Sequence, residues 1–250
     1  MSRTMARKYN FADFTFRNYR RLLDIAGRNH KFRTYTDFKK EENFVLWRHD
    51  IDFSMHSTRS MARIEAEKGI RATYFLLPHS EFYNLLEKEI FDIVKEIIGL
   101  GHEVGLHFDS HFYSITSENE IGRHLKKEKD FLEGLISKKI EVFSFHNTEP
   151  FTMNCKKWKY AGLVNTYAEY FQDNVKYCSE SNWYWRHKRL EDILTDPGWR
   201  RLQVLTHPGW WQAKPMPPFK RVLRCIDGRA KKTLKTYLTC LAESGRKDIR

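Results

Sequence analysis

Short apolar runs alternate with longer amphipathic stretches along most of the chain. Each apolar run spans only a few residues and gives way to polar or charged side chains, which is typical of a strand buried in a parallel sheet. We expect strands at residues 43–48, 72–77, 103–107, 142–146, 163–167, 177–179 and 201–205. Apolar positions at helical spacing predict helices at residues 19–26, 57–69, 82–100, 118–135, 189–194 and 219–243.

The order of these elements predicts a mainly parallel sheet. Strand, helix and strand follow one another repeatedly, and parallel neighbours need a crossover of this kind. We therefore predict one α/β domain, built either as a barrel or as an open doubly wound sheet. Residues 1–42 are interpreted as a helical or irregular lead-in segment and residues 43–213 as the α/β domain. Residues 214–250 are interpreted as a basic helical segment, packed on the domain or extending from it.

Positive charge is concentrated at the C-terminal end of the chain. The formal net charge is +12, and residues 214–250 hold 11 Lys and Arg against 3 Asp and Glu, a surplus of 8. This segment is interpreted either as a solvated basic helix or as a contact for membrane headgroups, nucleic acid or a nucleotide-linked substrate. Nucleic acid is the least favoured of these partners, because no helix-turn-helix, RRM or zinc-finger pattern is visible.

The sequence also gives an expectation for the compartment. No apolar run approaches the roughly 20 residues that a membrane-spanning helix needs. Residues 1–23 carry Arg or Lys every few positions and lack the apolar region of a secretory signal. We therefore expect a cytoplasmic protein, with peripheral contact at the inner membrane face through the basic segment as a further expectation.

Histidine, aspartate and aromatic residues gather where the expected strands end. The carboxyl ends of parallel strands meet on one face of the sheet, and α/β enzymes carry out their chemistry there. The polar or aromatic residues at these ends are Arg48, His49, Asp50, Asp52, Tyr74, His107, Asp109, His111, His146, Asn147, Tyr177, Ser179, Glu180, His207, Trp210 and Trp211. Such a concentration predicts a functional site on this face.

Two spacings within this group point to a metal. Asp50 and Asp52 are two residues apart, so an extended strand places both carboxylates on the same side, where two like charges need a cation or a shared proton. His107 and His111 are four residues apart, so on a helical turn or tight loop both imidazoles can meet one ion. Two His and one Asp leave a coordination position open for water, as in catalytic zinc sites, while a second Asp is spare. The alternative interpretation is a pair of strand-terminal carboxylates and a surface His pair.

Four motifs in the same order resemble the NodB-type polysaccharide deacetylases, which form carbohydrate esterase family 4, and in particular the subset associated with surface-polysaccharide biosynthesis. The resemblance covers residues 43–212 and rests on four segments: Leu46-Trp-Arg-His-Asp-Ile-Asp52, Ala72-Thr-Tyr-Phe75, Gly101-His-Glu-Val-Gly-Leu-His-Phe-Asp-Ser-His111 and Leu205-Thr-His-Pro-Gly-Trp-Trp211. It implies a single α/β domain folded as a distorted (β/α) barrel of about seven strands.

The resemblance also implies roles for five residues. Asp50 becomes the general base and His207 the general acid, whereas Asp52, His107 and His111 become the ligands of one divalent metal ion. Zinc is the expected metal, with cobalt, nickel or iron as alternatives that the same ligands suit.

The sequence departs from the family pattern at two places. Ile51 separates aspartates that are adjacent in many members, and residues 144–150 lack the arginine that orients the base in many members. Arg48 or Arg186 is the candidate replacement, or His146 contacts substrate instead. We also assign seven residues to substrate binding, with core packing as the alternative for the aromatic side chains: Arg48, His49, Tyr74, His146, Arg186, Trp210 and Trp211.

The resemblance therefore implies a metal-dependent hydrolase that removes an N-acetyl group from a sugar. The expected substrate is an intracellular precursor of a polysaccharide, such as a nucleotide- or lipid-linked sugar. The alternatives are a metal-dependent amidohydrolase or deformylase that acts on a non-carbohydrate amide, and a non-enzymatic nucleic-acid-binding protein that uses the basic segment.

Overall fold

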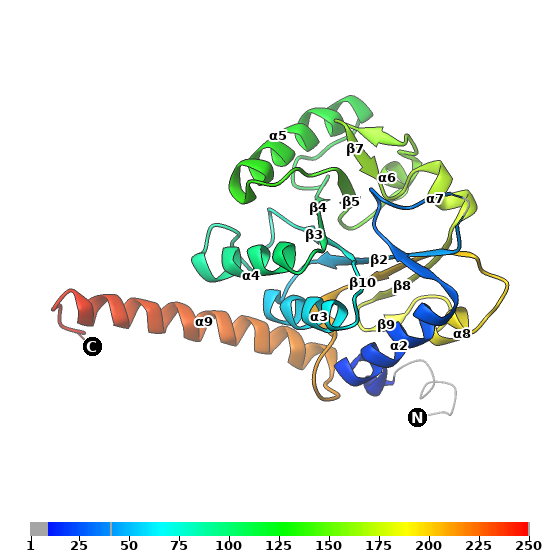
Figure 1. Ribbon diagram of the computed structural model, residues 1–250. Coiled ribbons are helices and arrows are strands. Elements are labelled where there is room, and N and C mark those ends of the chain that lie inside the picture. Colours follow the sequence, from blue (N-terminus) through cyan, green and yellow to red (C-terminus); the bar gives the residue numbers. More distant parts are fainter. Residues whose placement is uncertain (1–9, 41, 250) are drawn as a thin grey trace.

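A mainly parallel sheet forms the centre of the computed structural model, which describes residues 10–40 and 42–249 (Figure 1). The strands are β1 Lys31–Arg33, β2 Phe44–Ile51, β3 Thr73–Leu76, β4 Glu103–Phe108, β5 Val142–Phe145, β6 Lys159–Tyr160, β7 Leu163–Asn165, β8 Lys176–Ser181, β9 Tyr184–Trp185 and β10 Arg201–Thr206. The helices are η1 Phe11–Phe14, α2 Phe16–Asn29, α3 Met55–Glu67, α4 Lys88–Gly99, α5 Glu118–Ile136, α6 Pro150–Asn154, α7 Glu169–Asn174, α8 Leu190–Leu194, η2 Pro208–Trp210 and α9 Pro218–Glu243.

The strand order confirms the predicted α/β fold. Within the described residues the sheet runs β6-β7-β5-β4-β3-β2-β10-β8-β9, and β1 pairs with β2 beside this path. The stretch from β7 to β8 is parallel throughout, whereas β6 and β9 are antiparallel additions at its two ends. Helices surround the curled sheet (Figure 1). The expected lead-in segment therefore supplies one strand, β1, as well as α2.

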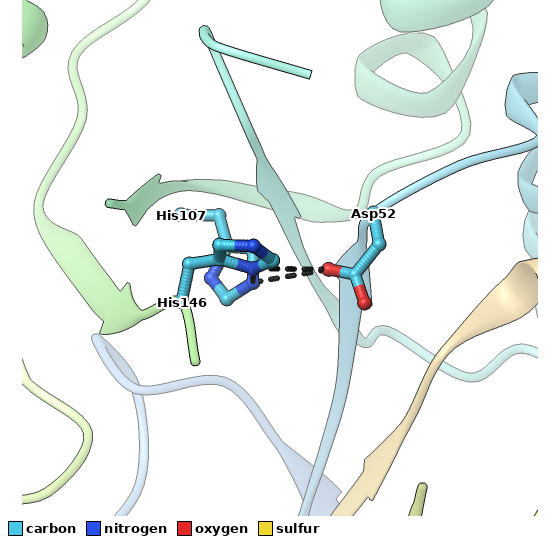
Figure 2. A group of neighbouring side chains, drawn as sticks. All are labelled: Asp52, His107 and His146. Carbon is cyan, nitrogen blue, oxygen red and sulfur yellow. Dashed lines mark hydrogen bonds and ion pairs between the residues drawn. The ribbon is translucent and has the colours of Figure 1, made fainter. Parts of the chain in front are cut away.

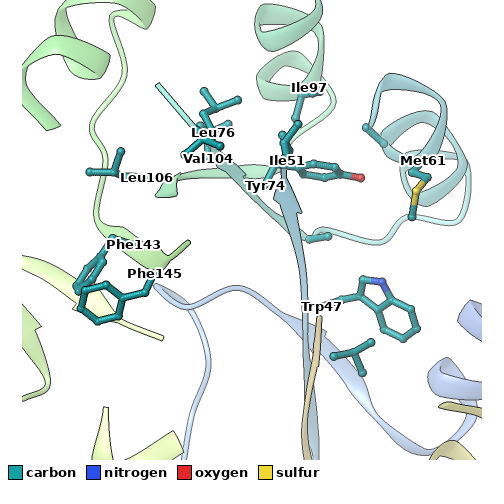
Figure 3. Packing of buried hydrophobic residues seen from close by; sticks show 14 of the residues in the cluster. Trp47, Ile51, Met61, Tyr74, Leu76, Ile97, Val104, Leu106, Phe143 and Phe145 are labelled. Carbon is teal, nitrogen blue, oxygen red and sulfur yellow. The ribbon is translucent and has the colours of Figure 1, made fainter. Parts of the chain in front are cut away.

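Strand β2 lies in the middle of this sheet, and all eight of its residues are buried. Its side chains alternate between two layers because successive residues of a strand point to opposite faces. Val45, Trp47 and Ile51 belong to the larger apolar cluster shared with the surrounding helices (Figure 3). Phe44 and Leu46 belong to a second apolar cluster on the inner face of the sheet, with residues such as Phe75 and Val142.

The same alternation decides which polar residues point inward. Arg48 and Asp50 share the inner face of β2 with Phe44 and Leu46, whereas His49 points to the helical layer. On β4, Val104 and Leu106 belong to the outer cluster, so Gly105 and His107 lie on the inner face. On β5, Ser144 is on the inner face with Val142. The inner face thus collects the charged residues at the ends of the strands.

Helix α9 is the least integrated element. Its first turns contact η2, and Arg221 is its one buried residue. Its distal half extends beyond the body of the fold (Figure 1). No helix within residues 10–40 and 42–249 combines the length and apolar character needed to cross a bilayer.

The close approach of β3 and β4 gives a stability prediction. Gly105 pairs with Phe75, and a Cβ at residue 105 would lie 2.5 Å from Cε1 of Phe75. We expect Gly105→Ala to lower the free energy of unfolding by about 1–3 kcal/mol, measured by urea denaturation.

Gly122→Ala in α5 is the matched control. Nothing lies within 4 Å of a Cβ added there, so the free energy of unfolding is expected to stay the same or to rise by up to about 1 kcal/mol. Wild-type stability of Gly105→Ala would show that β3 and β4 are not packed as described.

Candidate functional site

Three side chains from the carboxyl ends of three parallel strands converge on one point. Asp52 follows β2, His107 lies in β4 and His146 follows β5 (Figure 2). Oδ1 of Asp52 lies 3.2 Å from Nε2 of His107 and 3.5 Å from Nδ1 of His146, and these two nitrogens are 3.2 Å apart. Within the described part of the chain, this is the group of His, Cys, Asp or Glu residues close enough to share an ion.

The donor set fits a divalent metal ion. Two imidazole nitrogens and one carboxylate oxygen form a common catalytic zinc set that leaves a position open. Oδ1 of Asp52 is buried without a hydrogen-bond partner of its own among the described residues, although both nitrogens face it. Nδ1 of His107 lies 3.3 Å from the carbonyl oxygen of Ser144. A hydrogen bond donated there by Nδ1 leaves the lone pair of Nε2 directed at the centre, as metal-binding histidines require.

The electrostatics of Asp52 favour its ionised form. Burial alone would raise the pKa of Asp52, but the nearby His207, together with the imidazoles of His107 and His146 that face its carboxylate, outweighs burial and holds the pKa well below its usual value. A carboxylate that stays ionised at neutral pH is suited to bind a cation.

Asp50 lies next to this group but is held differently. Its Oδ2 accepts hydrogen bonds from Nη2 of Arg48 and from Oγ of Ser144, each at 3.0 Å. Its Oδ1 has no hydrogen-bond partner among the described residues and belongs to a carboxylate that lines the pocket. One oxygen therefore anchors Asp50, and the other is free to accept a proton.

Arg48 orients Asp50 from the same strand. The guanidinium is fully buried, donates to Asp50 and to the hydroxyl of Tyr167 at 2.9 Å, and lies over the ring of Phe75. Arg48 and Asp50 are two residues apart and so share the inner face. Of the two arginines considered from the sequence, Arg48 contacts Asp50, whereas Arg186 is exposed and lines the pocket wall.

His207 and Glu180 form a pair on the opposite wall. Glu180 lies in β8, the parallel neighbour of β10, which leads into His207. Its carboxylate accepts a hydrogen bond from the backbone N–H of His207, and its Oε1 lies 3.4 Å from Nδ1 of the imidazole. Burial would lower the pKa of His207, but Glu180 and then Asp52 outweigh it and raise the pKa to about 9. His207 is thus held as an imidazolium, with Nε2 3.9 Å from Oδ2 of Asp52.

A pocket of about 360 Å³ joins these groups. Asp50, Asp52, His107, His146 and His207 all line it. Its remaining wall comes from His111, Phe145, Asn147, Thr148, Glu149, Tyr167, Tyr177, Ser179, Glu180, Ser181, Arg186 and Leu205. The carboxylate of Asp50, the group of Asp52, His107 and His146, and the imidazolium of His207 therefore face the same pocket.

The structure brings His146, rather than His111, to the ligand group. The side chain of His111 is half-exposed, and its nitrogens lie 3.5 Å from Asp109 and 3.7 Å from Glu149. His146 comes from the end of β5, which pairs directly with β4. The spacing of His107 and His111 alone could not reveal this, because it carries no information about which strands become neighbours.

Arg48 and four further residues assigned to substrate from the sequence do not line the pocket. His49 and Tyr74 point into the helical layer, where Tyr74 donates to Glu65 of α3 and Nε2 of His49 lies 2.7 Å from the same carboxylate. Trp211 is fully buried and packs on Tyr19, and Trp210 packs edge-on against Phe53. For all four, contacts with neighbouring side chains account for their positions.

Sequence reasoning gave no role to Glu180, Ser144 or Tyr167. Glu180 was visible at the end of an expected strand, but its pairing with His207 depends on β8 and β10 being neighbours. Ser144 and Tyr167 act through Asp50 and Arg48, and no local pattern marks such long-range hydrogen bonds.

Comparison with solved structures finds family 4 carbohydrate esterases at low sequence identity. One from Bacillus anthracis is 13% identical with a TM-score of 0.48, and the match covers 84% of this chain and 86% of that one. The peptidoglycan deacetylase PdaC from Bacillus subtilis is 13% identical with a TM-score of 0.44, over 82% and 99% of the two chains. A family 4 pseudoenzyme from Bacillus anthracis is 17% identical with a TM-score of 0.43, over 84% of this chain and 64% of that one. No family model and no curated protein matches the sequence.

The geometry of the ligand group predicts the effect of single substitutions on metal binding. We expect Asp52→Ala, His107→Ala and His146→Ala each to weaken zinc or cobalt binding by more than the roughly 10- to 100-fold that second-shell changes cause. Isothermal titration calorimetry on metal-free protein measures this directly.

His111→Ala is the comparison variant. Because its imidazole is half-exposed and paired with other carboxylates, we expect a smaller loss than for His146→Ala. A larger loss of metal affinity for His111→Ala than for His146→Ala would contradict this geometry and favour His111, which the spacing in the sequence predicts, as the ligand.

Proposed function

We propose that this protein is a metal-dependent hydrolase that removes the N-acetyl group from a sugar, and that it belongs to the NodB-type polysaccharide deacetylases. The observation that carries the proposal is the arrangement around one pocket. Asp50 with a free oxygen, the group of Asp52, His107 and His146, and the imidazolium of His207 line the same space. The four ordered sequence motifs support the same family.

Amide hydrolysis requires polarisation of the carbonyl, removal of a proton from the attacking water and protonation of the leaving amine, and the pocket has a group for each step. A divalent cation, with zinc proposed first, would be held by Asp52, His107 and His146 and would polarise the acetyl carbonyl and acidify water. Asp50 accepts the proton of the attacking water through its free oxygen, while Arg48 and Ser144 hold its other oxygen. His207 donates a proton to the amine as the C–N bond breaks, so that acetate and a free amine leave.

We further propose that the substrate is a polysaccharide precursor, such as a nucleotide- or lipid-linked N-acetyl sugar. The support for this is electrostatic, because the basic C-terminal segment suits the anionic membrane surface on which a lipid-linked precursor is held.

The direct test is acetate release from such substrates by the zinc- or cobalt-loaded protein. Nucleotide-linked N-acetyl sugars, lipid-linked N-acetyl sugars and chitin oligosaccharides are offered in parallel, and acetate and new amines are both measured. Stoichiometric release of both products supports the proposal. Release only from formylated or non-carbohydrate amides would overturn it in favour of another amidohydrolase, and no release from any of them would place the chain among inactive proteins.

Substitution of the proposed base separates catalysis from metal binding. We expect Asp50→Asn to lower kcat/KM by roughly 10²- to 10⁴-fold while zinc still binds, because Asp50 is not in the ligand group. His207→Gln should lower kcat/KM to a similar extent. Near-wild-type turnover in either variant would contradict its assigned role.

The His207–Glu180 pair predicts the alkaline limb of the pH profile. The proton donor must be charged, and the pKa of His207 is raised to about 9, so activity should persist through neutral pH and fall above about pH 9. Glu180→Gln removes the main group that raises this pKa, so the falling limb should move to lower pH. A profile of kcat/KM against pH that is unchanged by Glu180→Gln would contradict the pairing.

A further inference from the structure

Helix α9 carries an exposed apolar stripe along its length. Phe219, Leu223, Ile226, Leu234 and Tyr237 are 71%, 39%, 48%, 57% and 58% exposed. Their separations of four, three, eight and three residues place them on one side of a helix, with Ala230 filling the gap in the middle. Single exposed apolar residues are ordinary, but an aligned row of five marks a surface that contacts something else.

The stripe is not what attaches α9 to the rest of the fold. The attachment uses polar contacts on another side of the helix. Nη1 of Arg229 lies 3.1 Å from Oε2 of Glu87, and Nζ of Lys232 lies 2.7 Å from Oε1 of the same carboxylate. Lys232 also pairs with Glu89, and Arg224 donates to Gln212. Ion pairs thus hold the helix, and the apolar side stays exposed.

A shallow apolar hollow continues the stripe toward the body. It has a volume of about 830 Å³ and is lined by Ile226, Leu234 and Tyr237 of α9 together with Phe82. The exposed surface is therefore broader than one row of side chains, and its distal part lies where α9 extends from the fold (Figure 1).

Unpaired positive charge borders the stripe. Lys220, Lys231 and Lys235 are exposed and make no ion pair within the described part of the chain. Helical geometry places Lys220 and Lys231 about 100° around the axis from the stripe and Lys235 somewhat further. Only Asp227 and Glu243 are acidic between residues 218 and 243. A partner for this surface must offer negative charge beside apolar material.

Charge complementarity separates the candidate partners. Pairing of the stripe with a second copy of α9 would bring lysines together with few carboxylates to balance them, which is unfavourable. Nucleic acid would match the lysines and leave the apolar stripe in water. A bilayer that contains anionic phospholipids matches both, because the stripe enters the boundary of the acyl region while lysines contact headgroup phosphates.

We propose that α9 is a membrane-surface helix that lies in the plane of an anionic phospholipid bilayer, with its apolar stripe inserted and Lys220, Lys231 and Lys235 at the headgroups. The proposal does not depend on the catalytic one, because no residue of the stripe lines the pocket that holds Asp52 and His207.

The test is co-sedimentation of the full chain with vesicles of phosphatidylcholine, alone or mixed with phosphatidylglycerol. We expect binding to the mixed vesicles, little binding to phosphatidylcholine alone, and weaker binding at high salt. The double variants Leu234→Gln/Tyr237→Gln and Lys231→Gln/Lys235→Gln should each weaken binding about tenfold or more.

Lys127→Gln/Lys138→Gln is the matched control, since both lysines are exposed and lie on or next to α5, away from α9 (Figure 1). It removes the same charge and should leave vesicle binding unchanged. Hydrolysis of a soluble substrate should be unchanged in all three double variants, so a failure of the catalytic proposal does not affect this test.

Three results would overturn the proposal. The first is no binding to the mixed vesicles. The second is an equal loss of vesicle binding in Lys127→Gln/Lys138→Gln, which would show that binding depends on the net charge of the protein and not on α9. The third is a dimer, detected by analytical ultracentrifugation, that Leu234→Gln/Tyr237→Gln dissociates while vesicle binding stays intact, which would assign the stripe to a second copy of the chain.

Discussion

The site depends on the need to balance two carboxylates at the end of one buried strand. Asp50 lies in β2 and Asp52 follows it, so two carboxylates stand two residues apart and each needs compensating groups around it. Asp50 is balanced by Arg48 from its own strand and by Ser144 from β5. Asp52 is surrounded by imidazoles that come from β4, β5 and β10. The two acids therefore differ in what faces them, and this difference is the basis on which Asp50 is proposed as the proton acceptor and Asp52 as a metal ligand.

The alternation of side chains along β2 separates the residues at the pocket from those in the layer under the helices. Because successive residues of β2 face opposite layers, Asp50 lines the pocket with Arg48 buried beside it, while His49, between them, packs against Glu65 of α3. Thr206 Oγ1 lies 2.7 Å from Nδ1 of His49, so this outer network also contacts the residue that precedes His207. The polar residues on the two faces of β2 thus share a backbone, but Asp50 lines the pocket whereas His49 joins a buried network with Glu65 and Thr206.

Much of the fold could be predicted from the sequence, because apolar runs and amphipathic stretches record the alternation of strands and helices directly. The strand-end positions of Asp50, Asp52, His107 and His207 follow from the same patterns, whereas their proposed roles rest on the family resemblance. The partners that complete the site could not be predicted, because they depend on strand order. His146 reaches Asp52 only since β5 lies beside β4, and Glu180 reaches His207 only since β8 lies beside β10. His49, Tyr74 and Trp211 show a second limit of prediction from the sequence. A polar or aromatic residue at the end of a strand can point to either face of the sheet, and its residue type does not tell which.

The central claim is that Asp52, His107 and His146 hold one catalytic metal ion. Crystals of the protein grown with zinc, with anomalous diffraction recorded across the zinc absorption edge, test it most directly. We expect one strong anomalous peak about 2.0–2.2 Å from an Asp52 oxygen, Nε2 of His107 and Nδ1 of His146, beside Asp50 and His207. A fully metal-loaded protein whose zinc lies elsewhere, or one that binds no zinc at this pocket, would contradict it.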